Sequence, residues 1–126
     1  MTAHLEHANV TVSNPDATAQ WMCDTFGWHI RWKGASLGGG TTIHVGTDNL
    51  YVALYNPNKP TRTAPNNYTT TGGLNHIAVV TDNLPEMENK VRKAGFEPHS
   101  HADYEPGQRF YFHDHDGIEY EVVHYD

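Results

Sequence analysis

The sequence has little cysteine, little positive charge and no long apolar run, and each shortage excludes a class of protein. A single cysteine, Cys23, cannot form a disulfide within the chain. Eight lysines and arginines stand against fifteen acidic residues, and the net charge of −7 argues against a nucleic-acid-binding surface. No apolar stretch approaches the roughly 20 residues that a membrane-spanning helix needs, so we expect no membrane partner. The start of the chain lacks the basic and then apolar pattern of a signal peptide, and we expect a cytoplasmic protein.

What the chain does have is an internal repeat. The segment LEHANVTV returns as LNHIAVVT, which sets His7 and His76 in register at a spacing of 69 residues. The segment GTDNLYVA matches DHDGIEYE at a spacing of 68, which aligns Ala53 with Glu121. A repeat of this length predicts two copies of one supersecondary unit. The four aligned residues occupy equivalent positions, and all but Ala53 are of metal-ligand types.

Each copy is predicted to run strand, helix and then three strands. Asn14 and Pro15 have the character of a helix N-cap and first residue, while Gly27 and Gly95 are placed as helix ends. We expect helices at 15–26 and 84–94, and strands at 5–12, 28–34, 41–46, 50–56, 74–81, 97–102, 108–113 and 118–124. The predicted fold is α+β, with two tandem β-α-β-β-β modules that form a curved, half-open mixed sheet around a central cavity. The expected organisation is a single domain over 1–126, with modules at 1–56 and 74–126 and a Pro-, Asn- and Thr-rich linker at 57–73.

Alternation along the strands places His7, His76 and Glu121 on one inner face. Two imidazoles and one carboxylate suit Fe(II), and are also compatible with Mn, Zn, Ni or Co. We therefore expect one divalent metal ion, held by three protein ligands, with about three positions open. An open face of this kind can bind two adjacent oxygens of a small-molecule substrate.

Further polar residues are candidates for contact with a substrate. The strand at 108–113 places Arg109 and Tyr111 on one face, where Arg109 could clamp an anion and Tyr111 could donate a hydrogen bond. A solvated edge strand explains both nearly as well. The candidate catalytic residues are Tyr111, Arg109 and His113, and the candidate substrate-binding residues are Asn9, Tyr51 and Tyr55, for which packing within the strands is the alternative.

The repeat segments, the ending KAGF of the second helix and the segment FYFHDHDGIEYEV together resemble the vicinal oxygen chelate superfamily. This group includes glyoxalase I, bleomycin-resistance proteins, extradiol dioxygenases and fosfomycin-resistance proteins. The last segment is similar to the family pattern F-x-D-P-D-G-x-x-x-E, with His115 where proline is usual. The resemblance implies that His7, His76 and Glu121 are the metal ligands. Ala53 stands where glyoxalase I supplies a fourth ligand, which argues against the glyoxalase reaction.

The resemblance implies a small divalent-metal-dependent enzyme that binds an oxygen-bearing molecule bidentately and performs dioxygenase- or lyase-type chemistry. One alternative is a fosfomycin-type thiol transferase, in which case a thiol is the second substrate. The other is a non-catalytic protein that sequesters a small molecule such as an antibiotic. We expect a homodimer, because the exposed edges of small sheets need a partner. The sequence leaves open whether each metal site lies within one chain or is shared between two.

Overall fold

The computed structural model describes residues 1–126 and divides them into two compact units, Met1–Arg62 and Thr63–Asp126. Each unit contains one helix and four strands, in the order strand, helix and three strands that the repeat predicts. The first unit contains β1 (His7–Thr11), α1 (Pro15–Phe26), β2 (His29–Ala35), β3 (Thr41–Gly46) and β4 (Tyr51–Asn56). The second contains β5 (Ile77–Val80), α2 (Leu84–Lys93), β6 (His99–Tyr104), β7 (Gly107–His113) and β8 (Glu119–Tyr125).

Local capping explains where the helices begin and end. The side chain of Asn14 accepts a hydrogen bond from Ala17 N at 3.1 Å, and Asn83 does the same for Glu86 N at the start of α2, also at 3.1 Å. Gly27 adopts φ = 72° after α1, a left-handed conformation that suits glycine. The predicted bounds of α1 are therefore confirmed. Neither helix has the length and apolar character required to cross a membrane.

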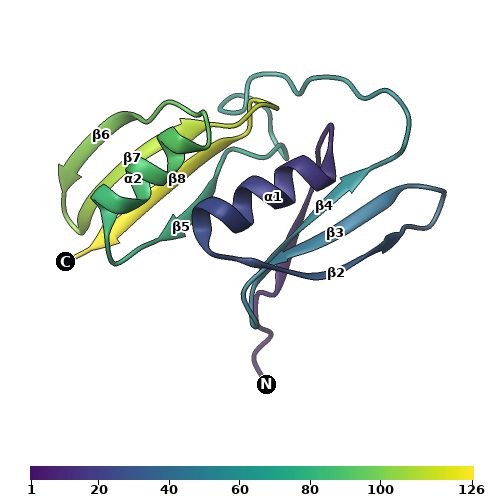
Figure 1. Ribbon diagram of the computed structural model, residues 1–126, viewed down its shortest axis with the longest axis horizontal. Helices are drawn as coiled ribbons and strands as arrows, with labels where there is room; N and C mark the ends of the chain where they lie inside the picture. Colours follow the sequence, from purple (N-terminus) through teal and green to yellow (C-terminus); the bar gives the residue numbers. More distant parts are fainter. The chain divides into compact units, whose positions relative to one another are not determined.

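The first unit is a mixed sheet with the strand order β1-β4-β3-β2, in which β1 runs parallel to β4 and the other pairs are antiparallel. Helix α1 lies along one face of this sheet (Figure 1). The helix buries Ala19 and Met22, and the strands bury Ile43, Val45 and Leu54. The opposite face, which carries His7, is left without a helix of this unit.

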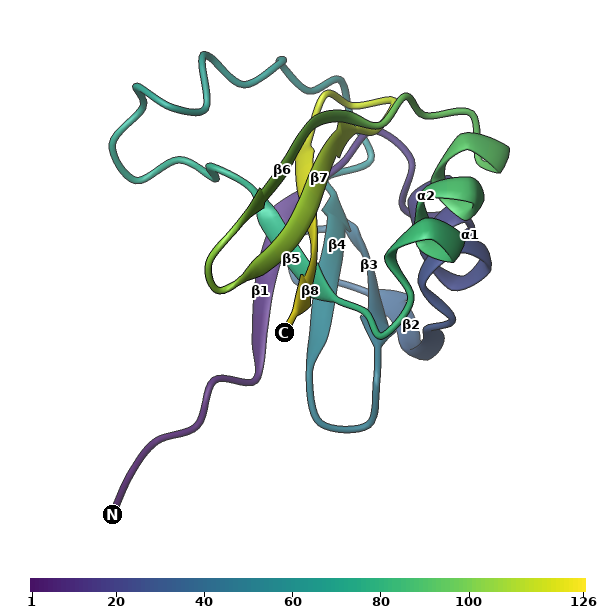
Figure 2. The ribbon, with the colours of Figure 1, turned by 90° about the vertical axis from the view of Figure 1, so that its left-hand side faces the viewer.

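The second unit repeats the plan with the strand order β5-β8-β7-β6, and β5 runs parallel to β8. Helix α2 packs beside β7 and β8 (Figure 2). The core of the second unit contains Val91, Phe110, Phe112, Tyr120 and Val122, all fully buried. Phe112 and Tyr120 stack with ring centroids 5.0 Å apart.

The α+β prediction with two β-α-β-β-β modules is confirmed, and the strands form two unclosed four-stranded sheets. The fifth strand is shorter than predicted, because it begins at Ile77 and not at Leu74. The carbonyl of Asn75 accepts a hydrogen bond from the Asn67 side chain at 2.7 Å, so this stretch is held by the preceding loop.

Candidate functional site

In the second unit, His76 and Glu121 lie against each other. His76 immediately precedes β5, and Glu121 lies in the middle of the neighbouring strand β8. The distance between His76 Nε2 and Glu121 Oε1 is 3.0 Å. The side chain of Glu121 is only 11% exposed and that of His76 is 32% exposed, so the pair is shielded but reachable.

The other ring nitrogen of His76 already has a partner. Nδ1 lies 2.6 Å from Asn75 Oδ1, an oxygen that can only accept a hydrogen bond. When Nδ1 donates to this oxygen, Nε2 of the neutral ring presents a lone pair towards the Glu121 carboxylate. Two electron-rich atoms at this separation need a cation between them, either a proton or a metal ion.

Arg109 on β7 binds the second oxygen of the same carboxylate. Its Nη1 donates to Glu121 Oε2 at 2.9 Å, and its guanidinium carbon lies 4.5 Å from the centre of the Tyr104 ring. Nε and Nη2 of Arg109 are buried and have no hydrogen-bond partner. Burial alone would lower the pKa of Arg109, but Tyr104 and Glu121 together raise it, so the group is a fixed cation. Two of its donors therefore remain available for an acceptor.

Tyr111 lies directly opposite Glu121 in the β7–β8 register. Its ring meets the ring of His76 edge-on, with centroids 6.0 Å apart. Burial and then the charge of Glu121 raise the pKa of Tyr111. The phenol is therefore neutral and able to donate a hydrogen bond near this pair.

Glu119, two residues before Glu121, is held by the loop that precedes β5. Its carboxylate accepts hydrogen bonds from the Tyr68 hydroxyl and the Asn67 amide. Burial raises the pKa of Glu119, but these hydrogen bonds outweigh it and the pKa is lowered. The hydrogen bond to Glu119 raises the pKa of Tyr68 to about 12. The loop thus covers part of the β8 strand next to the pair.

The candidate acid–base residue His113 is exposed at the end of β7. Its Nε2 lies 3.7 Å from Glu119 Oε1, and its Nδ1 lies 3.0 Å from Nε2 of His99. The His99 and His113 rings are stacked. The contacts of His113 are thus with Glu119 and His99.

In the first unit, His7 repeats the arrangement of His76. Its Nδ1 lies 2.9 Å from Glu6 Oε1, and the Tyr51 hydroxyl donates to the same oxygen at 3.1 Å. The hydrogen bonds from His7 and Tyr51 lower the pKa of Glu6. In both units the residue before the histidine therefore binds Nδ1, and Nε2 of His76 faces Glu121. Such an outer hydrogen bond is the usual device that orients a metal-ligating imidazole.

The His7 ring also belongs to an aromatic stack. It lies 4.8 Å from the Tyr51 ring, which is 4.5 Å from the His44 ring. Burial, followed by the charges of His7 and Arg31, lowers the pKa of His44. The imidazole of His44 is therefore mainly neutral at pH 7.

The candidate substrate-binding residues differ in their surroundings. Tyr51 contacts His7 and Glu6, as just described. Asn9 is exposed on β1, opposite Ala53 on β4. Tyr55 is half-buried and lies so close to Gly40 that a Cβ there would come within 2.5 Å of the tyrosine ring. Tyr55 is thus held by packing, whereas Asn9 is open to solvent.

Sequence reasoning overlooked the partners of the two histidines. Glu6 and Asn75 occupy the same place in the repeat, directly before His7 and His76, and this position was the available signal. Tyr68 was overlooked because it lies in the expected linker. Neither unit gathers three His, Cys, Asp or Glu side chains that could hold a metal ion. The second unit supplies two neighbouring donors of metal-ligand type, His76 Nε2 and Glu121 Oε1.

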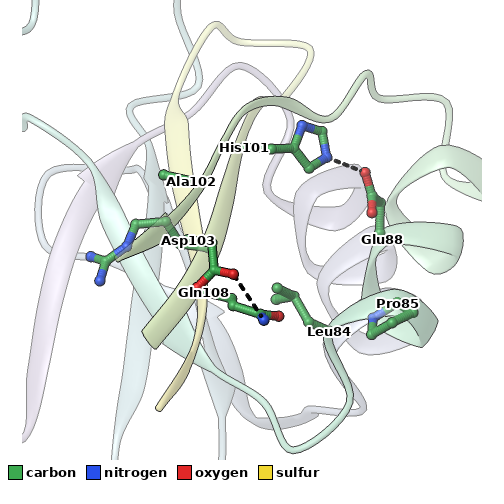
Figure 3. Close-up of a pocket in the computed structure, with 8 residues that line it drawn as sticks. Leu84, Pro85, Glu88, His101, Ala102, Asp103 and Gln108 are labelled. Atoms are coloured by element: carbon green, nitrogen blue, oxygen red, sulfur yellow. Dashed lines mark hydrogen bonds and ion pairs between the residues drawn. The ribbon is translucent and has the colours of Figure 1, made fainter. Parts of the chain in front are cut away.

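A pocket of about 410 Å³ lies in the second unit, between α2 and the strands β6 and β7. Figure 3 shows Leu84, Pro85 and Glu88 on the helix side, with the ring of His101 directed at Glu88. Asp103 and Gln108 face each other across the strands. Neither His76 nor Glu121 lines this pocket, but Arg109, which binds Glu121, does, so the pocket adjoins the pair through this arginine.

Several solved structures share the fold. A glyoxylase/bleomycin resistance protein/dioxygenase domain from Frankia sp. EAN1pec is 18% identical, with 100% of this chain and 94% of that chain covered and a TM-score of 0.82. The fosfomycin resistance protein FosX from Listeria monocytogenes, solved with Mn(II) and sulfate, is 15% identical, with 100% and 95% covered and a TM-score of 0.73. TnmS3, an antibiotic binding protein from Streptomyces sp. CB03234, is 15% identical, with 99% and 98% covered and a TM-score of 0.72. At these identities the likeness concerns the fold alone.

No curated protein matches this sequence. The family comparison is nevertheless decisive, because one model covers nearly the whole chain and agrees with the resemblance seen in the repeat segments. That model, described as the Glyoxalase/Bleomycin resistance protein/Dioxygenase superfamily, matches residues 4–122, and the chain therefore belongs to this superfamily.

Proposed function

We propose that this protein is a small divalent-metal-dependent enzyme that acts on an oxygen-bearing small molecule. In this proposal His7, His76 and Glu121 are the metal ligands, and the chemistry is of the dioxygenase or lyase type. The repeat supplies His7 as the third donor, either from the same chain or from a second copy in a homodimer.

One observation carries the proposal. His76 and His7 each have Nδ1 bound by the preceding side chain, at 2.6 Å and 2.9 Å respectively, so in both repeats Nε2 is the ring nitrogen left for a metal. The shared use of Nδ1 orients both rings in the same way, as two equivalent metal ligands would require. The Glu121 carboxylate 3.0 Å from His76 Nε2 adds the anionic donor that divalent cations of the first transition row accept.

Within the proposal, the surrounding residues bind and orient the substrate. A bound divalent metal would supply Lewis acidity towards a substrate oxygen. The neutral phenol of Tyr111 donates a hydrogen bond to an oxygen placed beside Glu121. Arg109 presents two unpartnered N–H groups, from Nε and Nη2, which suit an anionic part of the substrate.

A second function is favoured by the ion pair between Arg109 and Glu121. Because Nη1 occupies Glu121 Oε2, the carboxylate is already neutralised without a metal. A protein that only sequesters a small molecule needs no metal ion, and the Arg109–Glu121 ion pair would be sufficient to balance the carboxylate. TnmS3, which shares the fold, is described as an antibiotic binding protein, and FosX as a fosfomycin resistance protein. The thiol transferase alternative has no residue in the structure that favours it.

Metal analysis separates the two functions. Protein purified without chelator and without added metal is examined by elemental analysis, and the chelator-treated protein is titrated with Mn(II), Fe(II) and Zn(II) under anaerobic conditions. We expect one ion for each copy of the site, and loss of binding in His7→Ala, His76→Ala and Glu121→Ala. His29→Ala, which removes an exposed histidine of β2, is the matched control and should bind normally. A wild-type protein that takes up none of these metals would support sequestration.

A mixing experiment tests whether the site is shared. If one site takes ligands from two chains, His7→Ala and Glu121→Ala refolded together should recover metal binding at part of the sites. No recovery in a mixture shown to contain heterodimers would place each site in one chain. A protein that stays monomeric at micromolar concentration would contradict the dimer.

A further inference from the structure

Strand β2 contains an irregularity that places two adjacent side chains on one face. Ile30 pairs with Val45 and Trp32 pairs with His44, so Arg31 is an extra residue in a β-bulge. In a regular strand Arg31 and Trp32 would point to opposite faces. Here the Arg31 guanidinium lies 4.5 Å from the centre of the Tyr51 ring. Bulges are frequent beside functional sites, where they redirect a side chain.

Trp32 lies on the same face as this arginine. Its ring is 5.1 Å from the His44 ring, and His44 is itself stacked on Tyr51. The indole is 48% exposed although it is the largest side chain on β2. The bulge therefore brings an indole and a guanidinium to the face that carries His7.

The indole of Trp32 packs against the backbone of Gly34. A Cβ at Gly34 would lie 2.5 Å from Trp32 Cζ2 and 2.7 Å from Trp32 Cη2, so the ring rests across the backbone of this glycine. One side of the indole is thus fixed against the strand, while 48% of the residue remains exposed. A flat ring that is held in place before the ligand arrives loses little side-chain freedom on binding.

The carboxylate that acts on the guanidinium is Glu6, whose pKa Arg31 helps to lower after the hydrogen bonds from His7 and Tyr51, but the two form no ion pair. Arg31 forms no ion pair, whereas Lys33 on the same strand is paired with Asp16 at 2.5 Å. The ring of Tyr51 partly replaces water around the guanidinium, which strengthens its attraction for an anion. An oxyanion is the partner that a planar guanidinium binds best.

We propose that Arg31 and Trp32 form a subsite, here named the β2 subsite, for a planar aromatic ligand that carries an oxyanion. The indole stacks on the aromatic ring and the guanidinium binds the oxyanion. The inference deepens the proposed function, because it names the class of substrate, and it rests on that function for its catalytic meaning. The subsite itself lies wholly within the first unit and is measurable without a metal.

The test uses the full chain after removal of divalent metals with a chelator. Isothermal titration calorimetry measures the binding of 2-naphthoate, which is planar and anionic. Cyclohexanecarboxylate is anionic but not planar, and 2-naphthylmethanol is planar but neutral. We expect 2-naphthoate to bind about 5- to 10-fold more tightly than either comparison ligand, as stacking and a partly exposed charge pair each allow. No binding of 2-naphthoate at millimolar concentration, or equal binding of all three, would overturn the inference.

Variants assign the two contributions. Trp32→Ala should remove the preference for the planar anion over the non-planar one, and Gly34→Ala should do the same by displacing the indole. Arg31→Gln should remove the preference for the anion over the neutral compound. Ile30→Ala, also 48% exposed before mutation, and Lys33→Gln are the matched controls and should keep both preferences. If Trp32→Ala does not fold, Gly34→Ala still tests whether the position of the indole determines the preference for the planar anion.

If the control variants lost these ligand preferences to the same extent as the test variants, the inference would be overturned. Because every titration is done without metal, a failure of the β2 subsite and a failure of the metal proposal are recognised separately.

Discussion

Asp114, in the turn that connects β7 to β8, offers a stability prediction that the structure makes quantitative. Asp114 Oδ1 accepts hydrogen bonds from the backbone N–H groups of Asp116 at 2.8 Å and Ile118 at 3.1 Å, and Oδ2 accepts one from the Tyr120 hydroxyl at 2.8 Å. Tyr120 is 0% exposed, so its hydroxyl has no access to water. The carboxylate therefore fixes the start of β8, the strand that carries Glu121.

We expect Asp114→Ala to lower the free energy of unfolding by about 3 kcal/mol. The buried Tyr120 hydroxyl loses its acceptor, which costs about 2 kcal/mol, and the two turn N–H groups, which can reach water, lose roughly 0.5 kcal/mol each. Tyr120→Phe should cost about 1 kcal/mol, because the carboxylate keeps its other two donors. The double variant Asp114→Ala/Tyr120→Phe should be more stable than Asp114→Ala alone by about 1 kcal/mol, since no buried hydroxyl is left without a partner.

Urea unfolding of the four proteins, followed by circular dichroism at one pH, measures these differences. A double variant whose loss equals the sum of the two single losses would refute the reasoning, because it would mean that the two side chains are not coupled. A changed dependence on urea concentration in any variant would show a change in the unfolded or native state beyond the lost hydrogen bonds.

Four further predictions concern pH, the metal ligands and the loop. Burial raises the pKa of Asp114, so the folded state binds a proton more readily than the unfolded chain does. The free energy of unfolding should therefore fall as the pH rises from about 4 through the folded pKa of Asp114. Asp114→Asn should remove this fall, as measured by urea titrations at several pH values. Asn75→Ala should weaken metal binding about 10- to 100-fold in calorimetry, whereas Asn75→Asp should retain it, because either acceptor orients the imidazole. Arg109→Met should tighten metal binding about tenfold in a chelator competition assay, whereas Arg109→Lys should not, because it keeps a cation beside Glu121. Unchanged metal affinity in both variants would show that Arg109 does not compete with the metal ion for Glu121. Tyr68→Phe should increase the rate of limited proteolysis within residues 63–73 roughly threefold, and an unchanged rate would mean that the hydrogen bond to Glu119 does not hold the loop.

The fold could be predicted from the sequence where local chemistry and the repeat agreed. Asn14, Pro15 and Gly27 set the bounds of α1 through capping, which acts within a few residues. The bounds of β5 could not be predicted, because the hydrogen bond from Asn67 to the Asn75 carbonyl depends on the path of a loop. Long-range contacts of this kind leave no periodic signal in the chain.

The candidate site was predictable only as far as strand register allowed. Register predicts that His76 and Glu121 share a face, and the structure places them in contact. The ion pair between Arg109 and Glu121 depends on how a long side chain is directed, which alternation does not specify. The β2 subsite was hidden for a different reason, since the bulge at Arg31 breaks the alternation on which such reasoning depends.

The packing of the Trp32 indole against Gly34 has a consequence for the evolution of this protein. A mutation that gives position 34 a side chain displaces the indole at once, whereas a mutation that first removes the indole leaves position 34 free to vary. The order of substitutions along a lineage is therefore constrained, with position 32 changing before position 34. Descendants that keep tryptophan at position 32 should keep glycine two residues later, and those that have lost the tryptophan should show alanine, serine or larger residues there.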